Sequence, residues 1–238
     1  MKAGEPSMGN NTQKPPQDQI KALAELYHQM NFSEVLEKGA QVAAQHPNDI
    51  TILNILGAAN AALKQWGHAA DCYRKAVQIA PDDDGYYNLG VILYNLGERS
   101  EAMESFLHAL KINATHPEAN SNLGLVLCDL GRNDEAIKHF NQAIQVNPNY
   151  AEAHSNLGLA HAANGQYDKA IACYNAALQF NSDLASTRAE QIYLKNRICD
   201  WQITEQEIET IPKLGIAGEP VQPFVMLALE DAPERHRL

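Results

Sequence analysis

The feature that most constrains this chain is an internal repeat that recurs with a fixed period. The triplet Asn-Leu-Gly occurs at residues 88–90, 122–124 and 156–158, and a related Ile-Leu-Gly precedes them at residues 55–57. A fixed period of about 34 residues indicates an architecture in which one small unit is stacked several times. A generic helical bundle requires no fixed period, so the repeat argues against that alternative.

The register extends into a second segment of each unit. An alanine follows each glycine at a constant offset, an aromatic ring follows that alanine by four, and a second alanine follows the ring by three. Residues at i, i+4 and i+7 share one face of a helix. The small residues would let two helix backbones approach closely, with the ring beside them. These positions are Ala69, Tyr73 and Ala76; Ala102, Phe106 and Ala109; Ala136, Phe140 and Ala143; Ala170, Tyr174 and Ala177.

Turn and stop signals separate the expected helices. Gly97, Gly131 and Gly165 lie between the two helices of their units, where glycine readily ends a helix. Pro81 and Pro148 follow second helices, because proline lacks the N–H group and clashes with the preceding turn. The pattern therefore predicts a helix-turn-helix unit and an all-α protein.

This unit resembles the tetratricopeptide (TPR) repeat, a helix-turn-helix of about 34 residues. The resemblance implies a right-handed superhelical solenoid of about five units plus C-terminal helices. The first unit is degenerate, since it has a short inter-helix turn and Gly39 at the aromatic site. The predicted boundaries are a disordered arm at 1–17, a TPR array at 18–184 (a degenerate unit at 18–49, then 50–82, 83–116, 117–150 and 151–184), and a C-terminal extension at 185–238.

The repeat ends after Leu184, and the C-terminal residues follow other patterns. Residues 185–201 are predicted to form one more amphipathic helix, and Thr204 with Glu207 gives a capping-box pattern for a short helix. Residues 224–229 are consecutively apolar and need a surface to pack on. We expect them either to cap the last unit or to dock on a domain outside this chain.

Two segments of this extension resemble a more specific family. Cys199-Asp200-Trp201 and residues 223–229 are similar to the region that joins TPR repeats to the catalytic domain in O-GlcNAc transferases and their SPINDLY-like relatives. That resemblance implies that the repeats select protein substrates for sugar transfer. The sequence ends at Leu238, where the catalytic half of that family would begin, so we do not expect this chain to be an enzyme. The alternative is a free-standing TPR scaffold with no link to glycosylation.

The resemblance also implies a concave groove lined by the first helix of each unit, where an asparagine ladder holds the backbone of an extended peptide. The matching positions are Asn88, Asn122 and Asn156. A side-chain amide offers two donors and an acceptor to any peptide unit. Asparagine is also a poor helix former, so its recurrence favours binding over the alternative of a plain surface or inter-repeat role. The same groove is predicted to carry Asn54, Tyr87, Tyr94, Ser121, Leu125, Ser155 and Leu159.

Charge indicates which partners fit. The chain has 18 Lys and Arg against 29 Asp and Glu, a net charge of −11, which argues against nucleic acid. The predicted groove positions of the clear units carry no Lys or Arg, which excludes the carboxylate clamp of chaperone-binding TPR domains. We expect proteins or extended peptides, neutral or basic, as partners, and we leave assembly into a homo-oligomer open.

Other residue patterns predict no cofactor and no metal site. His154 and His161 share a helix face but supply too few ligands. The four cysteines lack metal-ligand spacing and are predicted to be reduced thiols of a cytoplasmic protein. The run Asp82-Asp83-Asp84 is expected to be an inter-repeat turn. The longest apolar run is too short to cross a bilayer, so no membrane partner is expected.

Overall fold

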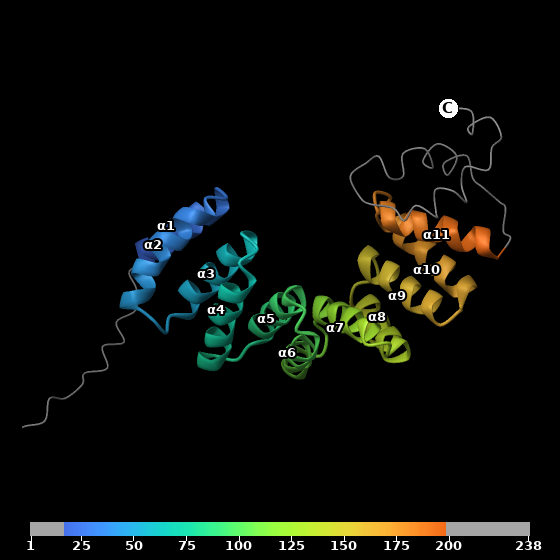
Figure 1. Cartoon of the computed structure of the whole chain (residues 1–238), viewed down its shortest axis with the longest axis horizontal. Coiled ribbons are helices and arrows are strands. Elements are labelled where there is room, and N and C mark those ends of the chain that lie inside the picture. Colours follow the sequence, from blue (N-terminus) through green and yellow to red (C-terminus); the bar gives the residue numbers. More distant parts are fainter. Residues whose placement is uncertain (1–16, 199–238) are drawn as a thin grey trace, which may run out of the picture. The chain divides into compact units, whose positions relative to one another are not determined.

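The computed structural model describes residues 17–198, and this part of the chain forms eleven α-helices and no β-strand (Figure 1). The prediction of an all-α fold is therefore confirmed. The helices are α1 (Gln17–His28), α2 (Phe32–Gln45), α3 (Ile50–Ala62), α4 (Trp66–Ile79), α5 (Asp83–Leu96), α6 (Arg99–Ile112), α7 (Pro117–Asp129), α8 (Asn133–Val146), α9 (Ala151–Ala163), α10 (Tyr167–Phe180) and α11 (Ala185–Arg197).

Several predictions for the chain ends concern residues outside the described range. They are the N-terminal arm up to residue 16, the Cys199-Asp200-Trp201 segment, the short helix after Thr204 and the apolar run at 224–229. Gln17, which the sequence pattern places in the arm, is the first residue of α1. The helix predicted over residues 185–201 is α11, which ends at Arg197 with Ile198 as its C-cap.

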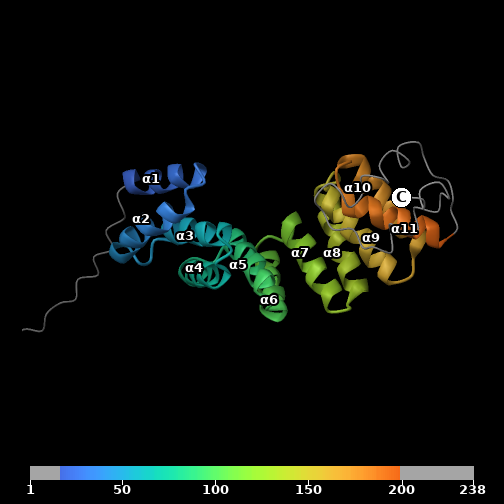
Figure 2. The ribbon, with the colours of Figure 1, turned by 45° about the horizontal axis from the view of Figure 1, so that its top comes forward.

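The helices pair as the repeat predicts. In each of the five units the first and second helices pack against each other, as α5 does with α6 and α9 with α10. Three of the second helices also pack on the first helix of the next repeat: α2 on α3, α4 on α5 and α8 on α9. Helix α11 follows as a single helix on α10, and Figure 2 gives a second view of these pairs.

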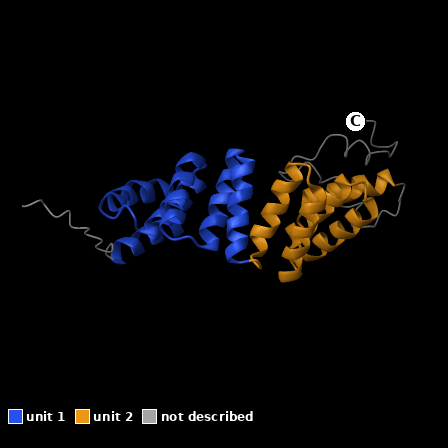
Figure 3. Ribbon diagram, turned by 90° about the horizontal axis from the view of Figure 1, so that it is seen from below, with its two compact units in different colours: residues 1–113 blue, residues 114–238 orange. Residues whose placement is uncertain are grey.

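The described helices fall into two compact units, coloured separately in Figure 3. Unit 1 ends at Asn113 and holds α1 to α6, while unit 2 begins at Ala114 and holds α7 to α11. The sequence predicts one array and shows no break in its period at this boundary. The repeat pattern therefore does not predict the division into two compact units.

A glycine on the first helix meets the aromatic ring of the second helix in each clear unit. A methyl group placed at Gly124 would lie 2.6 Å from Cε1 of Phe140, and one at Gly158 would lie 2.5 Å from Cε1 of Tyr174. Both rings are fully buried. The pairs Gly57–Tyr73 and Gly90–Phe106 repeat this contact in unit 1. The predicted role of the small residue and the ring in helix packing is thus confirmed.

The turns between paired helices use a left-handed residue. Gly97, Gly131 and Gly165 have φ values of 85°, 74° and 72°. Met30 and Lys64 occupy the same place in the first two units, with φ values of 60° and 57°. A Cβ atom makes this conformation unfavourable. The glycine pattern therefore predicts the turns at Gly97, Gly131 and Gly165. It does not predict the turns at Met30 and Lys64, where a residue with a side chain adopts the left-handed conformation.

Candidate functional site

The packing of the repeats leaves one side of α5 only partly buried. Its buried residues include Leu89, Gly90 and Leu93, which meet neighbouring helices. The residues at 84, 88, 91 and 95 are half-buried or exposed. The spacing i, i+4, i+7 and i+11 places these four on one side of the helix. We call these four positions of a first helix its open stripe.

In the helices α3, α7, α9 and α11 the corresponding four positions are half-buried or exposed as well. An acidic, small or polar residue begins each stripe, and an amide, an apolar residue or a carboxylate comes second. The stripes are Thr51, Ile55, Ala58 and Ala62 in α3; Asp84, Asn88, Val91 and Asn95 in α5; Glu118, Asn122, Leu125 and Asp129 in α7; Glu152, Asn156, Leu159 and Ala163 in α9; Ser186, Glu190, Tyr193 and Arg197 in α11.

The three asparagines of the predicted ladder hold the second position of consecutive stripes and are half-buried. Within residues 17–198, the side-chain amides of Asn88 and Asn156 make no hydrogen bond. Other helical asparagines differ, since Nδ2 of Asn60 donates to the Leu56 carbonyl at 2.8 Å and Nδ2 of Asn95 donates to the Val91 carbonyl at 2.8 Å. The amides of Asn88 and Asn156 are thus not used within the described fold.

The predicted aromatic residues lie beside the α5 stripe and are half-buried. The ring centroid of Tyr87 is 6.1 Å from that of Phe106, so Tyr87 packs on the core ring of its own unit. The Arg99 guanidinium lies over the Tyr94 ring, with its Cζ 4.9 Å from the centroid. Both tyrosine rings therefore already make contacts within the protein.

Three further predicted residues differ in their environment. Leu125 is half-buried, and Leu159 is 43% exposed although it is apolar. Asn54 in α3 is half-buried, and its Oδ1 atom is buried without a hydrogen-bond partner in the described part of the chain. Leu125 and Leu159 hold the third position of adjacent stripes in unit 2 and give that face an apolar element.

The prediction that Ser121 and Ser155 line the groove is wrong. Ser121 is 2% exposed and Ser155 is 8% exposed. The Ser155 hydroxyl forms a 2.7 Å hydrogen bond with the Thr187 hydroxyl of α11. A position one residue before the asparagine is rotated by about 100° around the helix. That rotation turns these serines away from the stripe and into the packed part of unit 2.

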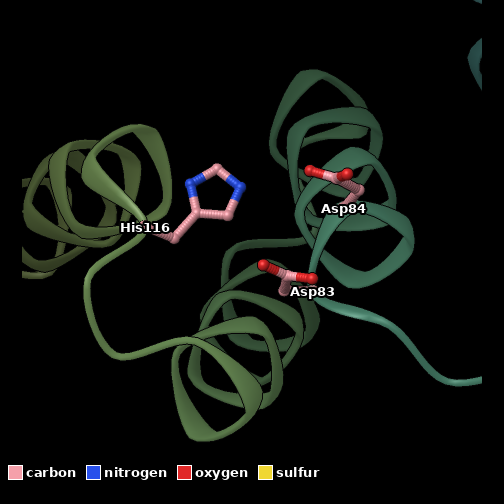
Figure 4. Close-up of side chains that lie close together, drawn as sticks. All are labelled: Asp83, Asp84 and His116. Atoms are coloured by element: carbon pink, nitrogen blue, oxygen red, sulfur yellow. The ribbon is translucent and has the colours of Figure 1, made fainter.

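The acidic run before α5 has a structural role. Asp82 is the N-cap of α5, and its carboxylate accepts a hydrogen bond from the Gly85 N–H at 2.8 Å. Asp83 and Asp84 lie in the first helical turn, where carboxylates interact favourably with the helix dipole (Figure 4). Nδ2 of Asn113 donates to Asp83 at 2.7 Å. The run is therefore a helix start, which corrects its prediction as a turn.

His116, His154 and His161 each have a separate local partner. His116, also labelled in Figure 4, is the N-cap of α7, and its Nδ1 accepts from the Ala119 N–H at 3.2 Å. Nε2 of His154 donates to the Pro148 carbonyl at 2.9 Å. Nδ1 of His161 lies 2.8 Å from Oε1 of Gln166. His154 and His161 are therefore engaged in different contacts, as expected for surface residues.

The described cysteines are neutral thiols at physiological pH. Burial, and next the nearby Asp129 carboxylate, raise the pKa of Cys128 to about 11. Burial is also the main cause that raises the pKa of Cys72 and Cys173. Reactive cysteines require the opposite shift of the pKa.

Among the described helices, none is both long enough and apolar enough to cross a membrane.

Family models for these repeats match the chain in three places. A model described as TPR repeat matches residues 124–165, and two models described as tetratricopeptide repeat match residues 151–184 and 84–116. No curated protein gives a significant match to the sequence.

Solved structures with the same fold include a pilus biogenesis factor, PilF of Pseudomonas aeruginosa and a TPR protein with a peptide-binding site. PilW, a widely conserved type IV pilus biogenesis factor, is 18% identical, with 90% of this chain and 97% of that chain covered and a TM-score of 0.74. PilF of Pseudomonas aeruginosa is 17% identical, with 90% and 95% covered and a TM-score of 0.74. YrrB, a TPR protein with an unusual peptide-binding site, is 22% identical, with 70% and 86% covered and a TM-score of 0.61.

At these identities the structural likeness concerns the fold alone. The family models identify tetratricopeptide repeats at residues 84–116 and 124–184, and the sequence period and the helix pairs before residue 84 follow the same pattern.

Proposed function

We propose that this chain is a protein-interaction module and that each of its two compact units holds an extended peptide segment along the open stripes of its own first helices. The observation that carries the proposal is the recurrence of asparagine at the second stripe position in α5, α7 and α9. Asn88 and Asn156 leave their amides without a hydrogen bond in the described fold. An amide that gains nothing inside the protein, and costs helix propensity at each recurrence, is explained by a ligand outside it.

The spacing of the stripes suits an extended chain. Packed helices have axes about 8–10 Å apart, and an extended peptide rises about 3.3 Å per residue. Asn122 and Asn156, which belong to successive repeats of compact unit 2, would therefore contact the ligand about three residues apart. Because each amide would bond a peptide group, the affinity depends weakly on the ligand's side chains.

The charge of the stripes supports a neutral or basic ligand. Asp84, Glu118, Asp129, Glu152 and Glu190 place carboxylates on the stripes, and the only basic stripe residue in the described range is Arg197. Its guanidinium Cζ lies 4.9 Å from the ring centroid of Tyr167. An acidic segment would meet carboxylates without cations to pair with them.

The test removes the three amides together. We expect the Asn88→Ala, Asn122→Ala and Asn156→Ala triple variant to bind a neutral peptide of about twelve residues, selected from a random library on the wild-type chain, at least about tenfold more weakly. Helicity and the melting temperature should change little. Asn141→Ala is the control, because that exposed side chain donates only to the Ile137 carbonyl of its own helix. Equal affinity of the wild type and the triple variant would refute the asparagine ladder.

A second candidate function is the substrate-recognition region of a protein O-glycosyltransferase. It rests on Cys199-Asp200-Trp201 and residues 223–229, both beyond the three family-model matches, which end at residue 184. Reading the genomic frame past Leu238 tests it. A catalytic half in frame would support this candidate, and a stop codon there would favour a free-standing scaffold.

A further inference from the structure

The second stripe position of unit 2 changes from an amide to a carboxylate at its last helix. Asn122, Asn156 and Glu190 follow one another at equal sequence intervals in α7, α9 and α11. Helices α7 and α9 are in contact, and the hydrogen bond between Ser155 and Thr187 joins α9 to α11. Glu190 is therefore the next rung after Asn156 on neighbouring helices of one unit.

The carboxylate of Glu190 lies half-buried without a compensating cation. Residues three or four positions away on α11 are its neighbours along the helix surface. They are Ser186, Thr187, Tyr193 and Leu194, and none of them is basic. No ion pair to Glu190 is formed by any residue in the range 17–198. Burial raises the pKa of this carboxyl group above its ordinary value.

The basic residues of α11 are directed to other partners. Nη2 of Arg188 donates to the Ser182 carbonyl at 3.1 Å, and Arg197 stacks over the Tyr167 ring. Lys195 follows Glu190 by five positions, on a different side of the helix, and has its own contacts. The helix thus places three cations close in sequence to Glu190 and pairs none of the three with it.

A buried hydroxyl near Glu190 also lacks a partner. Tyr174 is 0% exposed, and its Oη atom has no hydrogen-bond partner in the described residues. After burial itself, the charge of Glu190 is the largest cause that raises the pKa of the Tyr174 hydroxyl. The Tyr174 hydroxyl and the Glu190 carboxylate thus each lack a hydrogen-bond partner among the described residues.

Apolar surface accompanies the carboxylate. Tyr193, one helical turn after Glu190, is half-buried against the cluster of Ala170, Tyr174 and Leu194. Leu159 on the adjacent stripe is 43% exposed. Long basic side chains pack their methylene stems on such surface and hold the charged head at a carboxylate.

We propose that Glu190 is the anchor for a Lys or Arg side chain of the bound segment, about three residues along from the peptide group held by Asn156. The inference rests on the proposed peptide binding and adds a specificity-determining residue to it. The bound segment then has a preferred direction on unit 2. Asn122 and Asn156 bind peptide groups of any sequence, and Glu190 selects a basic side chain.

The test uses matched peptides on the full chain. The neutral peptide selected above is made in a series with a single Lys at successive positions, and each member is compared with a Gln peptide at the same position. We expect one Lys position to bind at least about fivefold more tightly than its Gln match, as a half-buried ion pair allows. In Glu190→Gln this ratio should fall to about one, while the affinity of the Gln peptide stays the same. Glu104→Gln is the control, since that exposed residue lies on the second helix α6, outside the stripes, and should leave the ratio nearly unchanged.

The outcomes distinguish a failure of the Glu190 anchor from a failure of peptide binding as a whole. If peptides bind and the Lys preference is absent, or survives Glu190→Gln, the anchor is wrong while peptide binding stands. If neither peptide binds, both are wrong. Zero-length carbodiimide cross-linking adds an independent readout. A bond from Glu190 to the peptide lysine supports the anchor, and a bond to a lysine of the same chain or of a second copy, unchanged by added peptide, would overturn it.

Discussion

At the scale of single residues, the fold depends on a contact that recurs in every clear unit. A glycine on the first helix leaves room for the ring of the second helix, and the rings of Phe106, Phe140 and Tyr174 are almost completely buried as a result. A buried ring cannot shift without displacing its neighbours, because protein interiors are close-packed. The glycine is therefore a packing requirement of the repeat.

We predict that Gly124→Ala lowers the free energy of unfolding by about 1–3 kcal/mol, because the added methyl group would meet the Phe140 ring. Urea unfolding followed by circular dichroism measures this. Gly67→Ala is the matched control, because nothing lies within 4 Å of a methyl group there, and it should change stability by at most about 0.5 kcal/mol. If the two variants unfold at the same urea concentration, the close contact at Gly124 is not important for stability.

At the scale of elements, α11 is attached to the repeats by polar side chains as well as apolar packing. The buried hydroxyls of Ser155 and Thr187 bond each other, and Nε2 of Gln191 donates to Oδ1 of Asn175 on α10. A buried hydroxyl that loses its partner costs more than the net gain of the bond. These pairs therefore specify where α11 docks.

We predict that Thr187→Val lowers the free energy of unfolding by about 1–3 kcal/mol, because it leaves the Ser155 hydroxyl buried and unpaired. The double variant Ser155→Ala with Thr187→Val should recover most of that loss, because both polar groups are then absent. A double-mutant cycle by chemical unfolding gives the coupling energy. Strictly additive effects would mean that the two hydroxyls do not depend on each other.

The elements differ in how much the sequence reveals about them. The helices of the repeat follow from the fixed period, because each small residue and ring recurs in register. The Ser155–Thr187 pair does not follow, since the sequence places Ser155 next to a ladder asparagine and burial is decided one position around the helix. The left-handed turn at Lys64 does not follow either, because tertiary packing overrides the preference of a single residue. Glu190 lies outside the predicted site because the predicted repeats end at Leu184.

At the scale of the whole molecule, the open stripes are divided between the two compact units. In the described residues, α3 and α5 carry the stripes of unit 1, and α7, α9 and α11 carry those of unit 2. The second stripe position is polar in all three of these helices of unit 2. In unit 1 it is Asn88 in α5 but the apolar Ile55 in α3. Four of the five stripe carboxylates, Glu118, Asp129, Glu152 and Glu190, lie in unit 2, so we expect unit 2 to dominate the binding of basic segments.

The central claim is that side-chain amides hold the ligand's backbone, and backbone chemistry tests it most directly. Calorimetric titration compares the selected neutral peptide with a sequence-scrambled version and with a version N-methylated at every third peptide group, which removes the donors that the amides would bind. The account predicts that the scrambled peptide keeps its affinity within about threefold and that one register of N-methylation weakens binding at least about tenfold. Loss of binding on scrambling, with full affinity in every N-methylated register, would contradict it.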